Sequence, residues 1–380
     1  MNKLERIDFP LKQQPNGDYL WLNLFRINSG NSGPHVHIQA NVHGAELQGN
    51  LVIHELMDFF INNPFKGSIT FIPFANPSAV NQKSGMYTQG RYNPVSGKNW
   101  NRNYFELLKN KDSEFNLKDF VTQNISHNEA QISENFKSVL FNICDNLEKK
   151  TAERGLQNED GHFNLLLQKV ASTADIVLDL HTGPVATRYI YTTDHQLKSA
   201  LNFQFPHYLI IPPEFDGAMD EASFMPWVSL SEEFKNQGRE LKNNFESYTI
   251  ELGSEERISF KEANLDSKRI LNYLLSKNVH DLKIEELPKT SIKTCLLKDY
   301  KSYYAPRGGL YEFCFAPGEA FKKGDVLAKS LNFKPVKGNE SFSKAVEEVY
   351  AVEDGIVINH STSASLAGGH PLYQVMENIQ

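Results

Sequence analysis

Residues 35–46 read His35-Val-His-Ile-Gln-Ala-Asn-Val-His43-Gly-Ala-Glu46, an apolar strand-like run that ends in a histidine and a glutamate three residues apart. On a turn that opens into a helix, residues at positions i and i+3 point to the same side. The His43 imidazole and the Glu46 carboxylate can therefore share one cation. The alternative interpretation is a helix-start carboxylate beside a solvated histidine.

A second histidine follows another apolar run. Catalytic zinc is commonly held by two histidines and one carboxylate, with a further position left for water. The run Ala174-Asp-Ile-Val-Leu-Asp-Leu-His181-Thr-Gly again has a histidine at its carboxyl end. Open α/β sheets bind ligands outside the carboxyl ends of their strands. We therefore predict that His181 joins His43 and Glu46 in a site for one zinc ion.

A third strand-like run, Ser247-Tyr-Thr-Ile-Glu251-Leu-Gly, contains a glutamate among residues that favour β-structure. An unpaired carboxylate is costly to bury, so its presence there needs a reason. A salt bridge at the end of a strand would be one. The functional alternative is a general base beside the metal, and we assign that role to Glu251.

Together these motifs resemble the succinylglutamate desuccinylase/aspartoacylase family of zinc carboxypeptidase-like hydrolases. The similarity covers roughly residues 30–255, and the C-terminal region resembles some bacterial members as well. It rests on the following set: His43-x-x-Glu46, Arg91, Asn99-Trp-Asn101-Arg102, Asp179-Leu-His181-Thr-Gly and Thr249-Ile-Glu251-Leu-Gly. The family often has Asp-Leu where this chain has Asn99-Trp100, and the segment from Arg91 to Arg102 is a few residues longer than in aspartoacylase.

The resemblance implies a role for each of these positions. His43, Glu46 and His181 correspond to the zinc ligands, and Glu251 corresponds to the catalytic glutamate. Asn101 and Arg102 correspond to the pair that binds the substrate carboxylate. Arg91 corresponds to the arginine that polarises the scissile carbonyl.

These assignments agree with the chemistry of the side chains. A guanidinium is permanently charged and can stabilise an oxyanion, which suits Arg91. Its planar fork also grips a carboxylate through two parallel hydrogen bonds, which suits Arg102. Solvated loop charges are the alternative interpretation for both arginines.

The composition is that of an ordinary soluble chain of 380 residues, with 40% hydrophobic and 22% charged residues. A net charge of −7 argues against nucleic acid or an acidic membrane as a partner, so local arginines have to hold an anionic substrate. The three cysteines form no Cys-x-x-Cys pattern and are interpreted as reduced thiols. With no signal-like segment or long apolar run, we expect a cytoplasmic protein, and a homo-oligomer is left open.

The order of the patterns predicts an α/β catalytic domain over residues 1–288, with a doubly wound mixed sheet of the zinc-carboxypeptidase type. Residues 81–104 lack periodicity, as expected of a functional loop. A charged, helical stretch over about 103–172 is interpreted as an insertion, either over the rim of the active site or as a solvated helical pair without a catalytic part. The remaining predicted strands are at 19–26, 35–41 and 67–77, of which the last includes a closing turn. The remaining predicted helices are at 47–61 and 261–276.

Residues 289–380 change to short strands and glycine turns, which resemble the barrel-sandwich domain of lipoyl and biotinyl carriers. Lys344 lies near the position of a modified lysine in such carriers. The polar residues 332–342, however, interrupt the tight hairpin that presents this lysine. We therefore expect a smaller β barrel-sandwich domain that packs on the catalytic domain and shapes one wall of its cleft.

Three functions remain open from the sequence. The leading one is a zinc amidohydrolase, or deacylase, that releases a carboxylate from a small N-acylated amino acid or a related acylated amine. The second is a metallocarboxypeptidase acting on short peptides that bear a carboxylate. The third is a binding or carrier protein with a structural metal site, for which a cofactor attached to Lys344 would be the sign.

Overall fold

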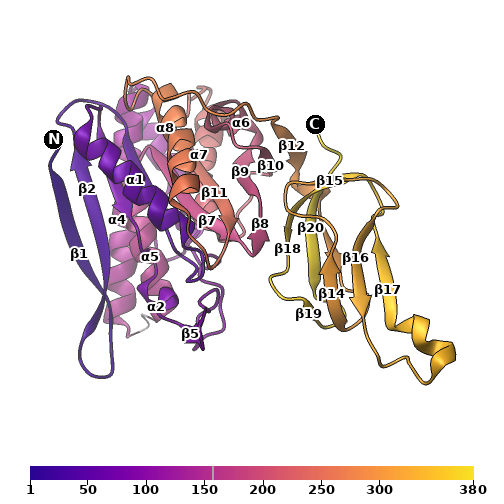
Figure 1. Cartoon of the computed structure of the whole chain (residues 1–380). Helices are drawn as coiled ribbons and strands as arrows, with labels where there is room; N and C mark the ends of the chain where they lie inside the picture. The colour runs from indigo at the N-terminus through magenta and orange to yellow at the C-terminus, as the bar shows by residue number, and fades with distance from the viewer. Residues whose placement is uncertain (156–157) are drawn as a thin grey trace.

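The computed structural model describes residues 1–155 and 158–380, so Leu156 and Gln157, which fall within the predicted helical insertion, lie outside the described residues. A nine-stranded sheet forms the larger part of the molecule (Figure 1). Its strands, in spatial order, are β1 (Leu4–Gln13), β2 (Tyr19–Asn28), β4 (Ser68–Ile72), β3 (His35–Ala40), β7 (Ile176–Gly183), β11 (Glu246–Ser254), β9 (Arg188–Thr193), β10 (His207–Ile211) and β12 (Lys293–Leu296).

This large sheet is mixed. Its centre is parallel, because β4, β3, β7 and β11 run in one direction. The pairs β1–β2, β2–β4 and β9–β11 are antiparallel. The central strands β3 and β7 are buried on both faces, as parallel strands covered by helices are, although each strand also contains polar residues. The predicted mixed α/β architecture is confirmed.

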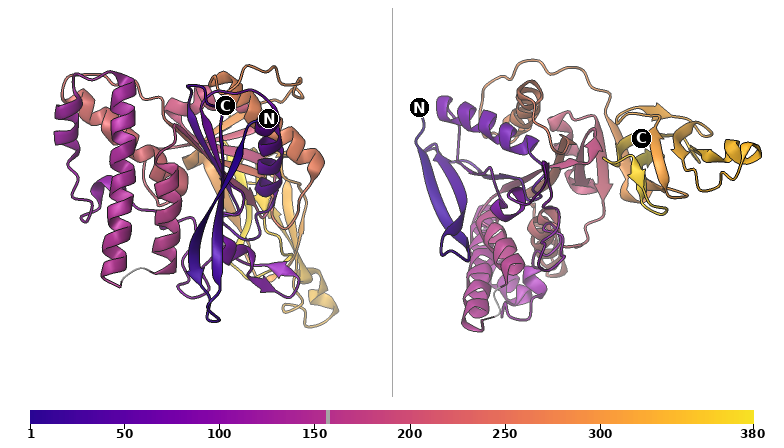
Figure 2. Two further views of the ribbon diagram at one scale, coloured as in Figure 1. Left: turned by 90° about the vertical axis from the view of Figure 1, so that its left-hand side faces the viewer. Right: turned by 60° about the horizontal axis from the view of Figure 1, so that its bottom comes forward.

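Helices cover both faces of the sheet, as the two layers in Figure 2 show. The helices α1 (Gln48–Asn62), α6 (Asp194–Ala200) and α8 (Phe260–Ser276) bury apolar residues against one face, together with the short η2 (Leu201–Phe203). The opposite face is covered by α3 (Leu117–Asn124), α4 (Glu129–Glu153), α5 (Glu159–Ala171) and α7 (Met219–Asn236). Three helices of this layer, α3, α4 and α5, lie within residues 103–172, so the described structure is largely helical there. No helix of the described chain has the length and apolarity that crossing a membrane requires.

The predicted helices at 47–61 and 261–276 and the predicted strands at 19–26, 35–41 and 67–77 are confirmed, with ends that differ by a few residues. Two short elements and a hairpin lie near the predicted functional loop. They are α2 (Pro77–Val80), η1 (Leu107–Lys109) and the hairpin of β5 (Lys83–Ser84) and β6 (Tyr87–Thr88).

The C-terminal part contains two smaller antiparallel sheets. One consists of β13 (Tyr300–Tyr304), β20 (Pro371–Glu377), β18 (Gly355–His360) and β15 (Ala320–Phe321), and β8 (Val185–Ala186) joins it at β18. The other consists of β17 (Val346–Tyr350), β16 (Val326–Leu331), β14 (Gly309–Phe313) and β19 (Ser365–Leu366). Residues of both sheets share one apolar core, which includes Leu327, Val357 and Leu372. The connecting η3 (Leu297–Asp299) precedes β13.

The boundary between the two parts differs in detail from a division at residues 288 and 289. Strand β12 follows this point in sequence, yet it extends the large sheet by pairing with β10. Conversely, β8 comes from the first part and pairs with β18 of the second. In addition, β16 and β17 are joined by a long connection that contains η4 (Asn339–Ala345), so Lys344 lies on a helical turn and not at the tip of a tight hairpin.

Candidate active site

The three strands that carry the predicted site residues are neighbours in the sheet. β3 and β11 both pair in parallel with β7, one on each side. In this register Ala40 is paired with Leu180, and Glu251 is paired with His181. The carboxyl ends of all three strands therefore lie at the same edge of the sheet. Glu251, the predicted general base, lies directly beside His181, a predicted zinc ligand.

The turn after β3 presents His43 and Glu46 together. Asn41 adopts a left-handed backbone conformation with φ of 66°, which asparagine tolerates better than most residues. Its side-chain Nδ2 donates to the carbonyls of His43 and Gly44 at 3.0 and 3.2 Å. Gly44 packs so tightly that an added Cβ would lie 2.2 Å from the Ala79 carbonyl oxygen. These contacts fix the turn before α1.

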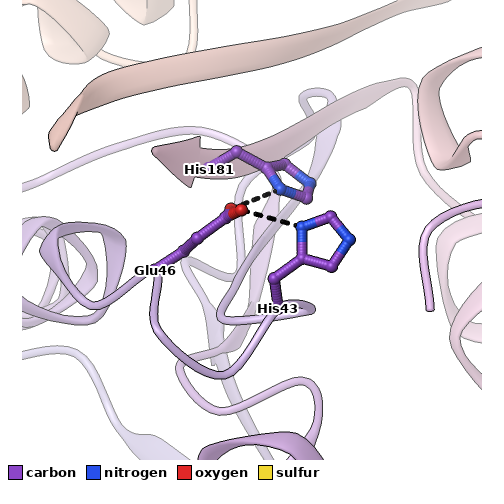
Figure 3. A group of neighbouring side chains, drawn as sticks. All are labelled: His43, Glu46 and His181. Atoms are coloured by element: carbon purple, nitrogen blue, oxygen red, sulfur yellow. Dashed lines mark hydrogen bonds and ion pairs between the residues drawn. The ribbon is translucent and has the colours of Figure 1, made fainter. Parts of the chain in front are cut away.

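His43, Glu46 and His181 form a buried cluster, and each is at most 4% exposed. The Nδ1 atoms of His43 and His181 lie 2.8 Å from Oε1 and Oε2 of Glu46, respectively (Figure 3). One ligand atom from each residue lies within 4.8 Å of the others. Two imidazole nitrogens and a carboxylate are a donor set that suits zinc, so the cluster fits one such ion.

The charges of the cluster are strongly coupled. Burial alone would raise the pKa of Glu46, but the two histidines hold this pKa well below its usual range. Burial would lower the pKa of His181, whereas Asp179 and Glu46 raise it well above its usual range. A carboxylate that stays ionised is the form that a metal ligand requires.

Each histidine of the cluster also has a partner for its second ring nitrogen. His43 Nε2 lies 2.8 Å from Oδ1 of Asn99, and His181 Nε2 lies 2.8 Å from Oδ2 of Asp179. Such partners fix the tautomer and orientation of a metal-binding imidazole. Asn99 and Asp179 have no role predicted from the sequence. The spacing of Asp179 and His181, two residues apart on one strand face, could have indicated that they interact.

Glu251 and Arg91 lie at the same site. Within residues 1–155 and 158–380, Oε2 of Glu251 is buried without a hydrogen-bond partner. Burial, followed by the negative charge of Glu46, raises the pKa of Glu251 to about 7. Arg91 is half-exposed, and its Nη1 lies 3.4 Å from Oε1 of Glu46. The structure thus brings both predicted catalytic residues next to the predicted ligands.

The side chain of Asn101 points to the metal cluster, and the side chain of Arg102 points to Asp216. Asn101 is buried, with Nδ2 located 3.4 Å from His181 Nε2, while its Oδ1 accepts a hydrogen bond from the Met219 backbone N–H at 3.3 Å. The half-exposed Arg102 lies with Nε 3.6 Å from Oδ2 of Asp216. Asn101 is therefore part of the cluster, whereas the guanidinium of Arg102 donates to the Asn101 backbone carbonyl at 2.7 Å and lies beside the exposed Asp216.

The helical segment supports the loop that contains these residues. The buried Trp100 packs edge-on against Phe163 of α5, with ring centroids 5.3 Å apart. Gln168 of the same helix bonds to both the N–H and the carbonyl of Phe105, at 3.0 and 2.8 Å. The segment therefore contacts the loop next to the site.

A cleft of about 1280 Å³ opens from His43, Glu46 and Arg91. Both structural parts line it, because Thr362 and Ser363 of the C-terminal part lie along one wall. The wall also includes Glu255, a further carboxylate with no role predicted from the sequence. Burial, and then the charge of Glu46, raises the pKa of Glu255 to about 7. The remaining wall includes Tyr87, Tyr92 and Arg257.

Comparisons with known proteins agree with the motifs. Residues 32–140 match the family model of the succinylglutamate desuccinylase/aspartoacylase catalytic domain. A crystal structure from Shewanella frigidimarina, assigned to the same family, is 35% identical and has a TM-score of 0.92, over 100% of this chain and 99% of that one. Another from Shewanella amazonensis, described as a protein of this family, is 35% identical with a TM-score of 0.90, over 99% of each chain.

More distant structures share the fold. A protein from Rhodobacter sphaeroides described as succinylglutamate desuccinylase/aspartoacylase is 19% identical and has a TM-score of 0.64, over 99% of this chain and 95% of that one. A comparison with curated proteins found no match.

Proposed function

Because the chain belongs to the succinylglutamate desuccinylase/aspartoacylase family of deacylase hydrolases, we propose that it is a zinc-dependent amidohydrolase. Its substrate would be a small N-acylated amino acid or a related acylated amine that bears a carboxylate. The convergence of two imidazole Nδ1 atoms on one buried carboxylate, with Glu251 in register beside His181, is the observation that supports this proposal most directly. This arrangement of side chains also favours a catalytic domain of the zinc-carboxypeptidase type.

Each residue has a defined task in this proposal. His43, Glu46 and His181 hold one zinc ion, which supplies a Lewis acid and makes water reactive at neutral pH. Glu251 accepts a proton from the attacking water and later returns it to the departing amine. A pKa near 7 suits both transfers, because the group then exchanges its proton readily at neutral pH.

The arginines and Asn101 bind and polarise the substrate. Arg91 is half-exposed beside Glu46, where its charge can stabilise negative charge on the carbonyl oxygen under attack. Asn101 offers an amide beside His181, and Arg102 offers a planar fork for the substrate carboxylate. Arg102 would exchange its contact with the exposed Asp216 for this ligand.

Peptide hydrolysis is the second candidate, because of the size of the cleft. Its volume of about 1280 Å³ exceeds the roughly 300–1,000 Å³ of an ordinary small-ligand pocket. A short peptide would reach from the metal cluster towards Thr362 and Ser363. The carrier hypothesis has less support, since Lys344 lies on a helical turn.

One screen tests these functions. Zinc-loaded protein is incubated with N-acetyl, N-succinyl and N-formyl amino acids and, in parallel, with short peptides, and the release of free amine is measured. Glu251→Gln protein serves as the control for contaminating hydrolases. We expect hydrolysis of at least one N-acyl amino acid. Hydrolysis of peptides alone would establish the second candidate, and a protein that holds zinc but cleaves none of these compounds would contradict both.

A further inference from the structure

A row of four buried polar side chains leads to the metal cluster from the interior of the sheet. His37 and Gln39 lie on one face of β3, and Asp179 and His181 lie on the same face of β7. Gln39 and Asp179 are direct neighbours in the parallel register of the two strands. His37, Gln39 and Asp179 are fully buried, although the opposite face of β3 is apolar.

Hydrogen bonds connect the row without a break. His37 Nε2 lies 3.0 Å from Oε1 of Gln39, and Gln39 Nε2 donates to Oδ1 of Asp179 at 3.1 Å. The other oxygen of Asp179 lies 2.8 Å from His181 Nε2. Burial of polar groups at this depth is costly, and these hydrogen bonds offset part of that cost. Among the described residues, Nδ1 of His37 has no partner, so the bond from Nε2 to Gln39 is what ties this imidazole to the row.

The direction of every bond follows from the chemistry of Asp179. A carboxylate can only accept hydrogen bonds, so Gln39 has to present its NH₂ group to Asp179 and its carbonyl oxygen to His37. His37 therefore donates from Nε2. On the other side of Asp179, His181 donates from its own Nε2, so Nδ1 is the ring nitrogen that would bind a metal in exchange for its proton.

Asn101 also approaches this ring. Its Nδ2 lies 3.4 Å from His181 Nε2. If Nε2 has a proton, this contact joins two donors. It therefore does not replace the bond from His181 to Asp179, and the orientation of the ring depends on how firmly Asp179 itself is held.

We propose that Gln39 and His37 are positioning residues for the metal site, which anchor Asp179 so that the Nδ1 atom of His181 faces the metal. This inference rests on the proposed function, since it assumes that His181 is a zinc ligand. Without Gln39, one oxygen of Asp179 loses its donor in a buried environment, and the carboxylate is then free to turn away from His181.

Gln39→Met tests the proposal, because methionine has a similar length and no hydrogen-bonding amide. Zinc affinity is measured by competition with a chromophoric chelator. We expect the dissociation constant to rise by about 10- to 100-fold, which is the usual effect of losing a group that supports a metal ligand. His37→Phe should weaken binding in the same direction, and His37→Gln, which keeps a donor, should recover part of the affinity.

Thr70→Val is the matched control for a merely structural effect. Thr70 is fully buried on β4, and its hydroxyl lies 2.9 Å from Nε2 of His35, a residue of β3 outside the row. This variant also removes a hydrogen bond from β3, in this case a partly buried one, but we expect its zinc affinity to stay within about 3-fold of the parent, well below the change expected for Gln39→Met. The thermal midpoint of each metal-free protein shows whether the variants are folded.

The outcomes separate the inference from the proposed function. Unchanged affinity in folded Gln39→Met protein, or an equal loss in Thr70→Val, would overturn the role of the row while leaving the zinc site intact. A parent protein that binds no zinc would instead contradict the proposed function itself. Reduced affinity in Gln39→Met and His37→Phe alone supports the inference.

Discussion

His181 lies between two carboxylates, Glu46 and Asp179, with one ring nitrogen directed at each. This arrangement predicts that His181→Ala removes a ligand that water cannot replace in a buried site, so zinc content should fall sharply. Metal analysis of purified protein measures this effect. His54→Ala, at an exposed histidine of α1, is the control and should keep the parent's zinc content. Full occupancy in His181→Ala protein would rule out this ligand set.

Glu251 differs from the ligands because its carboxylate has an unpartnered oxygen within the described structure. Glu251→Gln keeps the shape of the side chain but cannot accept a proton. We expect zinc content to be nearly unchanged and kcat to drop by roughly 10²–10⁴, the usual contribution of a positioned general base. If the variant loses zinc, Glu251 is a ligand and Glu46 has to be considered as the base. Undiminished activity would contradict the hydrolytic mechanism.

Arg102 tests how the substrate carboxylate is recognised. Arg102→Lys keeps the charge but loses the planar fork, so kcat/KM should fall on the order of 10-fold or more. Arg154→Lys is a matched control, because Arg154 is similarly exposed and likewise pairs with an aspartate, Asp112. A variant at Arg102 that hydrolyses its best substrate as fast as the parent excludes this role.

At the scale of elements, a buried ion pair joins β9 to α8. Arg188 donates to both oxygens of Asp266 at 2.7 and 3.0 Å, and the Asp266 side chain is fully buried. Burial outweighs the arginine and raises the pKa of Asp266 to about 6. The folded state therefore binds a proton more tightly than the unfolded state, in which the pKa is about 3.9.

This shift predicts that Asp266 makes the protein less stable as the pH rises from about 4 to about 6, with no further change above that range. Asp266→Asn removes this contribution. The difference in thermal midpoint between parent and variant should therefore shift in favour of the variant between pH 4 and 6, irrespective of any constant offset from the lost ion pair. If the thermal midpoints of parent and Asp266→Asn protein change in parallel between pH 4 and 6, the prediction is wrong.

The elements that could be predicted from sequence are those whose pattern is local. Apolar strand-like runs indicated β3 and the strand that contains His181, residues that favour β-structure indicated the strand that contains Glu251, and helical patterns indicated α1 and α8. Strand β1 was not predicted. It is an edge strand in which Ile7, Phe9 and Leu11 alternate with polar residues, and Pro10 interrupts the register. Strand β1 forms its hydrogen bonds with β2, and the sequence of the segment alone does not indicate this pairing.

The same limit applies to the site. His43, Glu46, His181 and Glu251 could be predicted because each is close to a strand end or to another ligand in sequence. Gln39 could not, since its function depends on its neighbour across the β3–β7 pair, which is 140 residues away. Side chains that support a ligand from an adjacent strand become visible only when the register is known.

At the scale of the whole molecule, the two parts share both strands and core. The backbones of Thr294 and Gln380 bond to each other in both directions, at 3.1 and 3.0 Å. One apolar cluster combines Tyr189 and Leu209 of the large sheet with Ile358 of the C-terminal part, among other residues. An apolar interface of this kind favours cooperative unfolding over independent domains.

Cooperativity can be tested because all three tryptophans, Trp21, Trp100 and Trp227, lie in the large α/β part, so selectively excited tryptophan fluorescence reports that part alone. Leu327 is fully buried in the core of the C-terminal sheets, away from every tryptophan-containing element. Leu327→Ala should cost about 2–5 kcal/mol. If the molecule unfolds as one unit, this cost lowers the midpoint of the tryptophan transition. Lys323→Ala, at an exposed position of the same part, should leave the midpoint unchanged. The parts unfold independently if Leu327→Ala leaves the midpoint of the tryptophan transition unchanged and far-ultraviolet circular dichroism reveals a second transition at a lower temperature.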